Sequence, residues 1–163
     1  MLKHVSAVRS RESVWDYPRP PALEAVLDLI VVEFDGRIIV ETRKSYRVLE
    51  TSHPPTYYLP PTDVDATVLV PSPMRTFCEF KGHAQYWSLR SGERVVENAA
   101  WFYPAPTDPF ALIKDYIAFY PSRVDACFIA GERVIAQEGD YYGGWITSNI
   151  VGPFKGGAGT AGW

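Results

Sequence analysis

Short alternations of apolar and polar residues, bounded by glycine and proline, run along most of this chain. Residues 30–40 place Asp35-Gly36 between two runs of β-branched residues, and Asp-Gly is the pair that a two-residue type I′ turn favours. The pattern therefore predicts a β-hairpin in which Val32 faces Ile39, with the next pair along the ribbon apolar as well. Because apolar pairs then fall on both faces of the ribbon, we expect both faces to be covered.

The same kind of pattern recurs twice further along the chain. Residues 86–97 alternate around Ser91-Gly92, and residues 124–136 alternate around Gly131. Glycine supplies the positive φ that tight hairpin turns require. The sequence therefore predicts two more hairpins.

A helical period appears in one place. Asp108 suits the N-cap, Pro109 suits the first helical position, and Phe110, Ile113 and Ile117 follow at helical spacing. This pattern predicts one short helix among the strands.

These elements predict a mainly β fold, a compact single domain over residues 1–163 with short antiparallel strands, a strongly bent sheet and one or two short helices. The length and the hydrophobic content of 47% suffice for one core, whereas two domains would each be small. We expect residues 1–12 to be a loose N-terminus. The glycine-rich residues 152–163 are either a mobile tail or a strap held by Phe154 and Trp163.

Charge and cysteine content exclude several classes of protein. The formal net charge of -3 and the pI near 5.6 provide no net field for nucleic acid or an anionic membrane, so neither is expected as a partner. No continuous apolar stretch resembles a secretory signal or a membrane span, which predicts a soluble, cytoplasmic protein. Cys78 and Cys127 form no CxxC pair, so we expect reduced thiols and neither a disulfide framework nor a thiolate zinc site.

Several motifs resemble one known family. They are Arg47–Tyr58 (RVLETSHPPTYY), Lys81-Gly82, Tyr86-Trp87, Trp101–Pro104 (WFYP) and Ala118–Tyr120 (AFY). The segment RVLETSHPPTYY resembles the signature of the domain-of-unknown-function 427 family, and the other motifs follow the same family pattern. The resemblance runs from about residue 15 to the C-terminus.

The resemblance implies a small tent-like β fold that some zinc-binding domains also adopt. Those relatives hold zinc with paired CxxC knuckles, so the resemblance implies a metal-free version here. A nucleotidyltransferase label has been attached to the family, but this chain has no GS motif with paired carboxylates to hold two metals. The family therefore supplies no reaction, and whether the protein is an enzyme stays open.

The segment RVLETSHPPTYY combines charge with aromatic side chains. Arg47 is suited to a carboxylate or phosphate, Glu50 to proton transfer, Thr51 to a ligand contact, and Tyr57 and Tyr58 to the wall of a pocket. On an extended strand Arg47 and Thr51 share one side while Glu50 lies on the other. The alternative is a structural Arg-Glu ion pair with the tyrosines packed beneath it.

A second group surrounds Lys81. The segment is not a phosphate-binding P-loop, but Lys81 precedes the aromatic pair Tyr86-Trp87, which predicts ligand contact by all three; a solvated charge is the alternative. Cys78 is a candidate nucleophile if Lys81 or His83 lowers its pKa, and a buried inert thiol is the alternative.

The aromatic content exceeds what core filling requires, so Trp101 and Tyr103 are also predicted to line the cleft. The segment Tyr141–Trp145 (YYGGW) forms either a structural corner or a flap over a ligand. A metal centre built from His53, His83 and Glu50 is a further alternative, although no histidine pair has metal-ligand spacing.

There is one candidate internal repeat. Residues 15–20 (WDYPRP) are matched by residues 101–106 (WFYPAP), and each copy precedes a strand pair that turns at a glycine. A true duplication and an aromatic-proline plug used twice both explain the match.

Two functions from different classes remain. The first is a small-molecule binding domain, with or without catalysis, whose cleft suits a small anionic or aromatic metabolite; no metal or nucleotide motif assigns a cofactor. The second is a non-catalytic module that uses exposed aromatic residues or the C-terminal strap to bind another protein or a second copy of itself, and in the latter case the protein would be a homo-oligomer.

Overall fold

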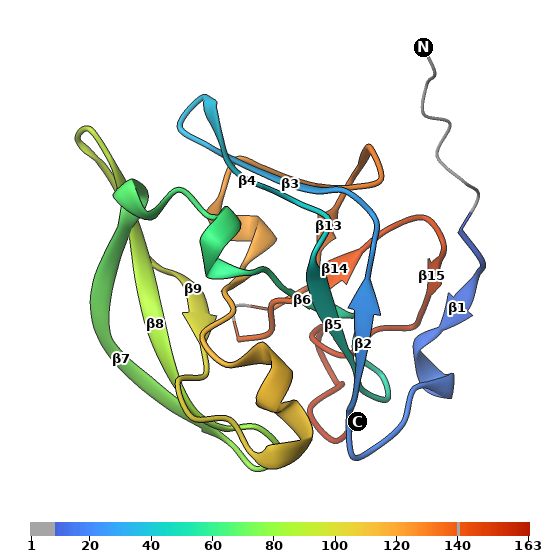
Figure 1. Ribbon diagram of the computed structural model, residues 1–163. Coiled ribbons are helices and arrows are strands. Elements are labelled where there is room, and N and C mark those ends of the chain that lie inside the picture. The colour runs from blue at the N-terminus through green and yellow to red at the C-terminus, as the bar shows by residue number, and fades with distance from the viewer. Residues whose placement is uncertain (1–8, 140) are drawn as a thin grey trace.

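The computed structural model describes residues 9–139 and 141–163, and these residues form a compact, mainly β domain (Figure 1). Its strands form several small sheets, most of them antiparallel, which confirms the predicted fold class. Across this part of the chain the helical segments are five short 3-10 helices. No helix of the described residues has the length and apolar character needed to cross a membrane.

The first sheet has four strands in the order β10-β9-β8-β7 and forms one side of the molecule in Figure 1. Its strands are β7 (Leu69–Cys78), β8 (Gly82–Ser91), β9 (Arg94–Phe102) and β10 (Ala118–Phe119). The hairpin predicted around Ser91-Gly92 is β8-β9, although Ser91 already pairs with Arg94, so the turn lies one residue later than expected.

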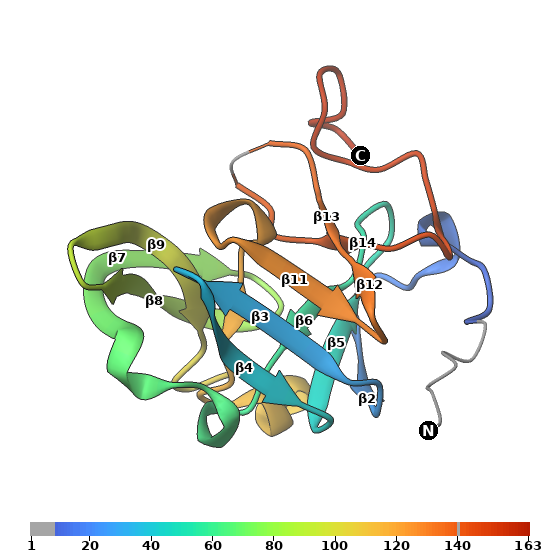
Figure 2. The same cartoon turned by 90° about the horizontal axis from the view of Figure 1, so that it is seen from above.

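The second sheet lies across the top of the molecule in Figure 1 and is seen face-on in Figure 2. Its order is β12-β11-β3-β4. The strands are β3 (Ile30–Phe34), β4 (Arg37–Thr42), β11 (Ala126–Ile129) and β12 (Glu132–Arg133). Both of its hairpins have positive φ at the two central turn residues, Asp35-Gly36 and Ala130-Gly131, as a type I′ turn requires. The predicted glycine hairpins are therefore confirmed.

The predicted register of the first hairpin is wrong in its inner half. A β-bulge after Val32 shifts the pairing by one residue, so Val32 faces Val40 instead of Ile39. Ile39 and Val40 are both buried as a result, whereas Ile38 is 52% exposed. A bulge places two residues opposite one and redirects side chains, which turn chemistry alone does not predict. The inward residues Ile30, Val32 and Phe34 are buried and the residues between them are not, so only one face of the ribbon is fully covered.

The third sheet, in the order β2-β5-β6, faces the first sheet across the molecule (Figure 1). Two pairs of two-residue strands complete the fold, β13-β14 and the parallel pair β1-β15. These strands are β2 (Ala22–Val26), β5 (Ser45–Leu49), β6 (Thr56–Tyr58), β1 (Glu12–Ser13), β13 (Ile135–Ala136), β14 (Trp145–Ile146) and β15 (Ile150–Val151).

The helix predicted from Asp108 is the 3-10 helix η4 (Asp108–Ile113), with Thr107 at the N-cap. Phe110 has non-helical φ and ψ in its middle, and the helix stops before Ile117. Ile117 instead exchanges backbone hydrogen bonds of 2.8 and 2.9 Å with Leu59, so a strand-like tertiary contact replaces the last predicted turn. The other 3-10 helices are η1 (Val14–Asp16), η2 (Pro61–Asp63), η3 (Ala66–Val68) and η5 (Pro121–Arg123).

The two ends of the described chain pack on each other. Residues 1–8 of the predicted loose N-terminus lie outside the described residues; the remainder is held, since Arg9 forms an ion pair of 3.0 Å with Glu132 and Glu12 pairs with Ile150. Residues 152–163 lie as a strap. The Trp163 ring contacts Trp15 at 5.3 Å between centroids, and Trp15 donates its indole N–H to the Pro153 carbonyl at 2.9 Å.

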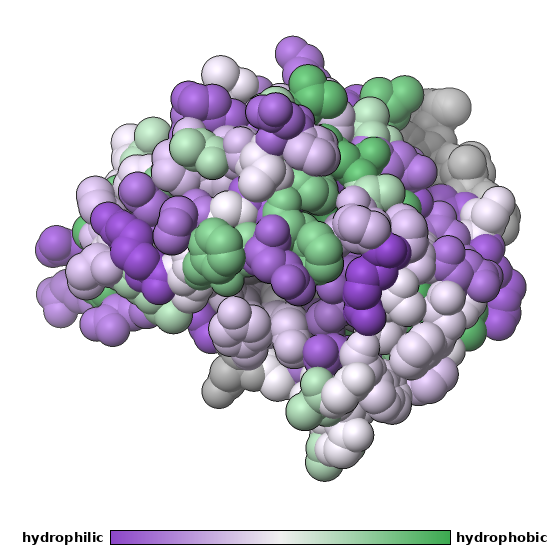
Figure 3. Space-filling model, turned by 90° about the horizontal axis from the view of Figure 1, so that it is seen from below, coloured by the Kyte–Doolittle hydropathy of each residue, from purple (hydrophilic) through white to green (hydrophobic). Residues whose placement is uncertain are grey.

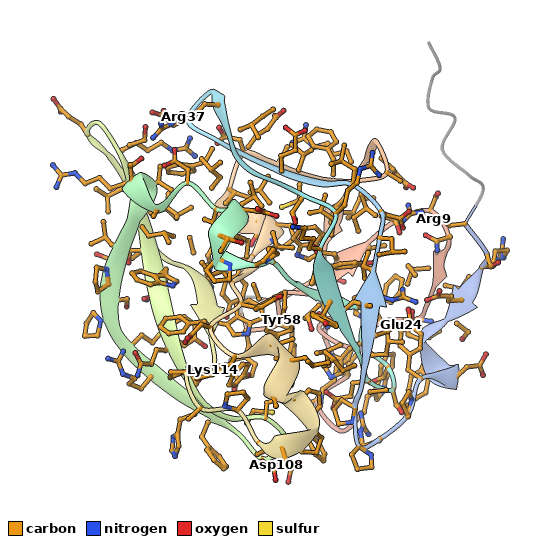
Figure 4. All side chains as sticks on the ribbon, in the orientation of Figure 1. Arg9, Glu24, Arg37, Tyr58, Asp108 and Lys114 are labelled. Carbon is orange, nitrogen blue, oxygen red and sulfur yellow. The ribbon has the colours of Figure 1, made fainter. Side chains whose placement is uncertain are left out.

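The core has two main parts. One packs the inner faces of the first two sheets together and contains Ile30, Phe34, Leu89 and Trp145. The other, which we call the aromatic cluster, fills the space between the first and third sheets. It contains Tyr58, Tyr86, Trp101, Tyr103 and Tyr120. Figure 4 shows Tyr58 near the centre of the molecule, between these sheets.

The two halves of the candidate repeat occupy unlike positions. Trp15 is 43% exposed in η1, whereas Trp101 is 7% exposed in β9. The glycine hairpins that follow them do pair with each other, through antiparallel β3 and β11. Both explanations of the match, a duplication and an aromatic-proline plug used twice, therefore stay untested.

Candidate functional site

A cavity of about 270 Å³ lies beside the aromatic cluster. Strands of the first and third sheets and loops near the C-terminus line it. The lining includes Glu50, His53, Tyr58, Thr76, Cys78, Lys81, Tyr86, Trp101, Tyr103, Tyr120, Gln137, Tyr141, Tyr142, Gly143 and Lys155. On the lower face of the molecule, apolar and strongly hydrophilic side chains lie side by side near the centre (Figure 3).

Strand alternation decides which residues of RVLETSHPPTYY reach the cavity. Val48 and Tyr58 line it, whereas Arg47 and Tyr57 line a separate depression on the other side of the sheet. Arg47 pairs with Tyr57 across β5 and β6, and Val48 and Tyr58 are the next residues along each strand. Since neighbouring side chains on a strand point to opposite faces, the segment contributes residues both to the cavity and to the separate depression.

Lys81 is the buried charge of the cavity, with 8% of its surface exposed. Its ammonium lies 5.8 Å from the ring centroid of Tyr103 and 5.7 Å from that of Phe110. Within residues 9–139 and 141–163 it forms no ion pair with a carboxylate. Burial by itself would lower the pKa of Lys81, but Tyr58, a hydrogen bond with Cys78 and the more distant Glu50 outweigh it, and the pKa lies above its usual value. The side chain is therefore a cation at neutral pH.

Tyrosine hydroxyls of the cavity lining form two separate hydrogen bonds. Trp101 donates its indole N–H to the Tyr58 hydroxyl at 3.2 Å, and the Tyr86 hydroxyl lies 3.0 Å from the Thr76 hydroxyl. Burial raises the pKa of Tyr58 and of Tyr103. Both hydroxyls are therefore neutral donors at neutral pH, and neither serves as a ready base.

His53 is neutral, and its neighbours fix its tautomer. The Gln137 side-chain oxygen accepts the Gly144 N–H at 3.0 Å, and its amide nitrogen donates to the Lys155 carbonyl at 2.7 Å. With the amide oriented in this way, the second hydrogen bond of its nitrogen, 3.2 Å to His53 Nδ1, requires Nδ1 to accept. The imidazole proton is thus on Nε2. Burial, together with Lys155, Arg19 and Lys81, lowers the pKa of His53 to about 4.

The paired glycines of the YYGGW motif close one wall. A Cβ at Gly143 would lie 2.5 Å from the Trp101 ring, so only glycine lets the backbone rest on the indole. A Cβ at Gly144 would lie 2.5 Å from Gln137 and 2.7 Å from Pro54. Gly144 therefore occupies a structural corner, and Gly143 is also part of the cavity wall. The structural corner is therefore confirmed, whereas the flap over a ligand stays a prediction.

Glu50 lies at the cavity edge but is engaged elsewhere. Its carboxylate is 3.6 Å from the Arg19 guanidinium, which also donates to the Trp163 carbonyl at 3.2 Å and the Thr51 carbonyl at 2.9 Å. This arrangement connects the strap to the third sheet. It places an ion pair, rather than an isolated carboxylate, beside the cavity.

Arg47, a predicted ligand contact, is 12% exposed and paired with two carboxylates on the far side of the third sheet. It donates two hydrogen bonds to Glu12, at 3.0 and 2.9 Å, and one of 2.7 Å to Glu24. Figure 4 shows Glu24 on the side of the molecule toward β1, away from Tyr58. The structural Arg-Glu ion pair that was the alternative for this segment is therefore present, and Arg47 forms it with Glu12 and Glu24.

Thr51, Tyr57 and Trp87 also lie away from the cavity. Thr51 donates its hydroxyl to the Tyr17 carbonyl at 2.6 Å, and Tyr57 packs on Trp145 at 5.0 Å between centroids. Trp87 stacks on Phe102 at 5.4 Å. Six of the ten predicted site residues line one cavity, namely Glu50, Tyr58, Lys81, Tyr86, Trp101 and Tyr103.

The alternative metal centre does not form. No three His, Cys, Asp or Glu side chains of the described residues are grouped so that they could hold a metal ion. His83 is exposed and packs on Phe77 at 4.8 Å, whereas His53 lines the cavity. On β8 the buried residues Ala84 and Tyr86 alternate with His83, which therefore points to the opposite face.

Sequence reasoning did not place Gln137, Tyr120 or Lys155 in the site. Gln137 and Lys155 carry no motif, and Gln137 meets His53 across 84 positions of sequence. The AFY motif that ends at Tyr120 was a signal for the family, and its ring packs on Trp101 at 4.6 Å. Such distant partners are visible only in the folded chain.

Fold and cavity together define a class, a small mainly β domain with a tyrosine-lined cavity around a buried lysine. The chain belongs to the family described as a domain of unknown function, DUF427, whose profile matches residues 22–130, more than half of the chain. This confirms the predicted family. No curated protein matches the chain. The matched segment supplies Tyr58, Lys81 and Trp101, whereas Tyr142 and Lys155 lie beyond it.

Proposed function

We propose that this protein binds a small anionic metabolite with a planar or aromatic group in the cavity around Lys81. One observation carries the proposal, the buried ammonium of Lys81 without a carboxylate counter-charge among the described residues. A buried charge is costly unless it is compensated, and the anionic group of a ligand would complete its compensation.

The remaining polar groups favour the same ligand. The hydroxyls of Tyr58 and Tyr103 and the Nε2–H of His53 are neutral donors, and Lys155 adds a second cation at the lining, 5.5 Å from the Tyr142 ring centroid. Donors and cations suit an anion better than a cationic ligand. The rings of Trp101 and Tyr103 supply flat apolar walls for a planar group.

The cavity volume of about 270 Å³ lies just below the usual range for drug-sized ligands, so the metabolite should be small. Should the site be catalytic, Glu50 at its edge would have to leave its ion pair with Arg19 to move a proton. We therefore place binding first and proton transfer by Glu50 second.

A thermal-shift screen with small carboxylates, phosphates and aromatic acids tests the proposal. A ligand at 100 times its Kd stabilises the folded state by about 2.7 kcal/mol, which raises Tm by several degrees in a domain of this size. We expect Lys81→Met to fold and to lose this shift. Replacing buried charged side chains with apolar side chains of similar volume often leaves the stability of a protein unchanged or raises it.

The matched control is Lys114→Met. Lys114 pairs with Asp115 at 3.2 Å, with 63% of its side chain exposed, so its loss should leave the shift unchanged. A well-folded protein that no anion stabilises, or a shift that survives in Lys81→Met, would contradict the proposal.

A further inference from the structure

The cavity wall also contains a thiol. Cys78 is the last residue of β7 and pairs with Gly82 across the turn to β8, and Lys81 lies in that turn with its side chain in the same cavity lining. Cys78 is half-buried and lines the cavity. Cys127, in contrast, is 1% exposed in the core of the second sheet, so the chain carries its own buried control.

The Cys78 sulfur and the Lys81 ammonium belong to the lining of the same cavity. Lys81 is 8% exposed and has no carboxylate partner in the described part of the chain, so its charge can hold the anionic group of a ligand in the cavity that Cys78 lines. Tyr58, Tyr103 and Tyr141 line the same cavity. One small volume thus holds a thiol, a cation and space for a ligand.

We propose that Cys78 is a nucleophile that forms a covalent bond with an electrophilic carbon next to the anionic group of a ligand held by Lys81. The thiol first loses its proton to solvent. The thiolate sulfur then attacks the carbon, the S–C bond forms, and the bond from carbon to the leaving group breaks, so that the leaving group departs with the electron pair. The ligand class is an acyl or alkyl carboxylate with a good leaving group, and the inference rests on the proposed anion site.

Alkylation of the folded full chain with iodoacetate and iodoacetamide tests this inference. The two probes carry the same electrophilic carbon, and only iodoacetate is anionic. We expect one adduct by intact mass, located at Cys78 by peptide mapping, with Cys127 unmodified until the protein is denatured. Relative to a free cysteine peptide, the ratio of the iodoacetate rate to the iodoacetamide rate should rise by roughly fivefold or more, as expected for one unit charge about 4 Å away.

Variants separate the roles of the two residues. Lys81→Met should return the rate ratio to that of the free peptide, Lys114→Met should keep it, and Cys78→Ser should abolish the adduct. An adduct at Cys127 in the folded protein, or a wild-type ratio equal to that of the peptide, would overturn the inference without reference to any variant. A ratio of the iodoacetate rate to the iodoacetamide rate that stays raised in Lys81→Met would also overturn the inference.

Failure of this inference is distinguishable from failure of the anion site. The thermal shift of the wild-type protein with a reversible anionic ligand reports on the anion site without any reaction at Cys78. If that shift persists while wild-type protein resists alkylation at Cys78, only the nucleophile is overturned. If neither the shift nor the rate ratio is observed, both proposals fall.

Discussion

His53 shows how surroundings set the chemistry of a single residue. The chain places one histidine in the cavity and another, His83, on an exposed strand face. Burial and three nearby cations lower the pKa of His53 to about 4, and Gln137 occupies its Nδ1. At neutral pH, His53 is therefore a neutral donor through Nε2 and adds no positive charge to the cavity.

This assignment predicts a pH dependence of stability. The folded pKa of His53 lies below the unfolded value of about 6.5, so below that pH the unfolded chain binds a proton that the folded chain does not. The stability that the neutral His53 contributes to the folded state is fully present above about pH 6.5 and decreases as the pH falls toward 4. We expect the free energy of unfolding, measured by urea denaturation, to fall by about 2 to 3 kcal/mol over this range.

Matched histidine variants isolate that contribution. His53→Gln should flatten the decrease between pH 6.5 and 4, whereas His83→Gln should leave it as in the wild type. A histidine NMR titration gives a second readout, in which His53 should titrate near 4. A midpoint near 6.5 for His53 would show that the tautomer and burial argued above are wrong.

Gly143 is the second residue whose environment gives a prediction. In Gly143→Ala, the new methyl group would collide with the Trp101 ring, and we expect a loss of roughly 1 to 3 kcal/mol in the free energy of unfolding. Gly162→Ala is the control, because a Cβ there meets nothing within 4 Å. Chemical denaturation followed by tryptophan fluorescence measures both. Equal stability of the two variants would mean that the YYGGW wall is loosely packed.

At the scale of elements, Arg47 connects three strands. It lies on β5 and binds Glu12 of β1 and Glu24 of β2. Burial alone would raise the pKa of Glu12, but hydrogen bonds from Arg47 and Tyr17 outweigh it, so the pKa lies below its usual value. Such a contact holds the short β1-β15 pair against the third sheet.

Arg47→Met should therefore act on stability and leave ligand binding intact. We expect a loss of about 2 to 3 kcal/mol at neutral pH, because the variant leaves Glu12 partly buried without its partner. Since the Glu12 pKa is lowered in the folded state, the difference from wild type should shrink as acid protonates that carboxylate. Denaturation at pH 7 and below pH 4 measures the change.

Arg37→Met provides the control for this effect. Its ion pair with Asp65 is exposed and should contribute no more than about 1 kcal/mol. If Arg47→Met abolished the anion-dependent thermal shift at unchanged stability, the ligand contact first predicted for Arg47 would be restored and the scaffold role rejected.

Across the whole molecule, the strap joins the C-terminus to the cavity. Lys155 donates its backbone N–H to the Ser52 carbonyl at 2.9 Å and accepts a hydrogen bond from Gln137 at 2.7 Å. Trp163 packs on Trp15 of the same chain. The strap is therefore engaged within one chain, which favours a structural cover over a contact with another copy.

Deletion of residues 152–163 tests that role. We expect a loss of about 2 to 4 kcal/mol in stability, since several hydrogen bonds worth about 1 kcal/mol each disappear, and weaker anion binding because Lys155 is removed. The mass by light scattering should fall only by that of the deleted residues. Deletion of 161–163 alone removes Trp163 and keeps Lys155, so anion binding should persist. A halved particle mass would instead support the self-association module.

Local signals in the sequence were enough for several elements. Asp35-Gly36 and Gly131 require left-handed turn conformations that few other residues adopt, so their hairpins followed from chemistry within a few residues. The β-bulge after Val32 and the short 3-10 helix at Asp108 did not, because distant contacts set them. Propensity is a weak guide wherever tertiary hydrogen bonds compete with local ones.

The sequence by itself determined the family, through motifs spread along the chain. It also determined the mainly β class, the glycine hairpins and the opposite faces of Arg47 and Glu50, since these depend on residues close together along the chain. Only the tertiary structure decided that Lys81 is buried beside Cys78 and that Arg47 is paired elsewhere. Burial and charge pairing depend on what the rest of the chain brings to a side chain. The residues next to a side chain in the sequence do not determine its burial or its charged partner.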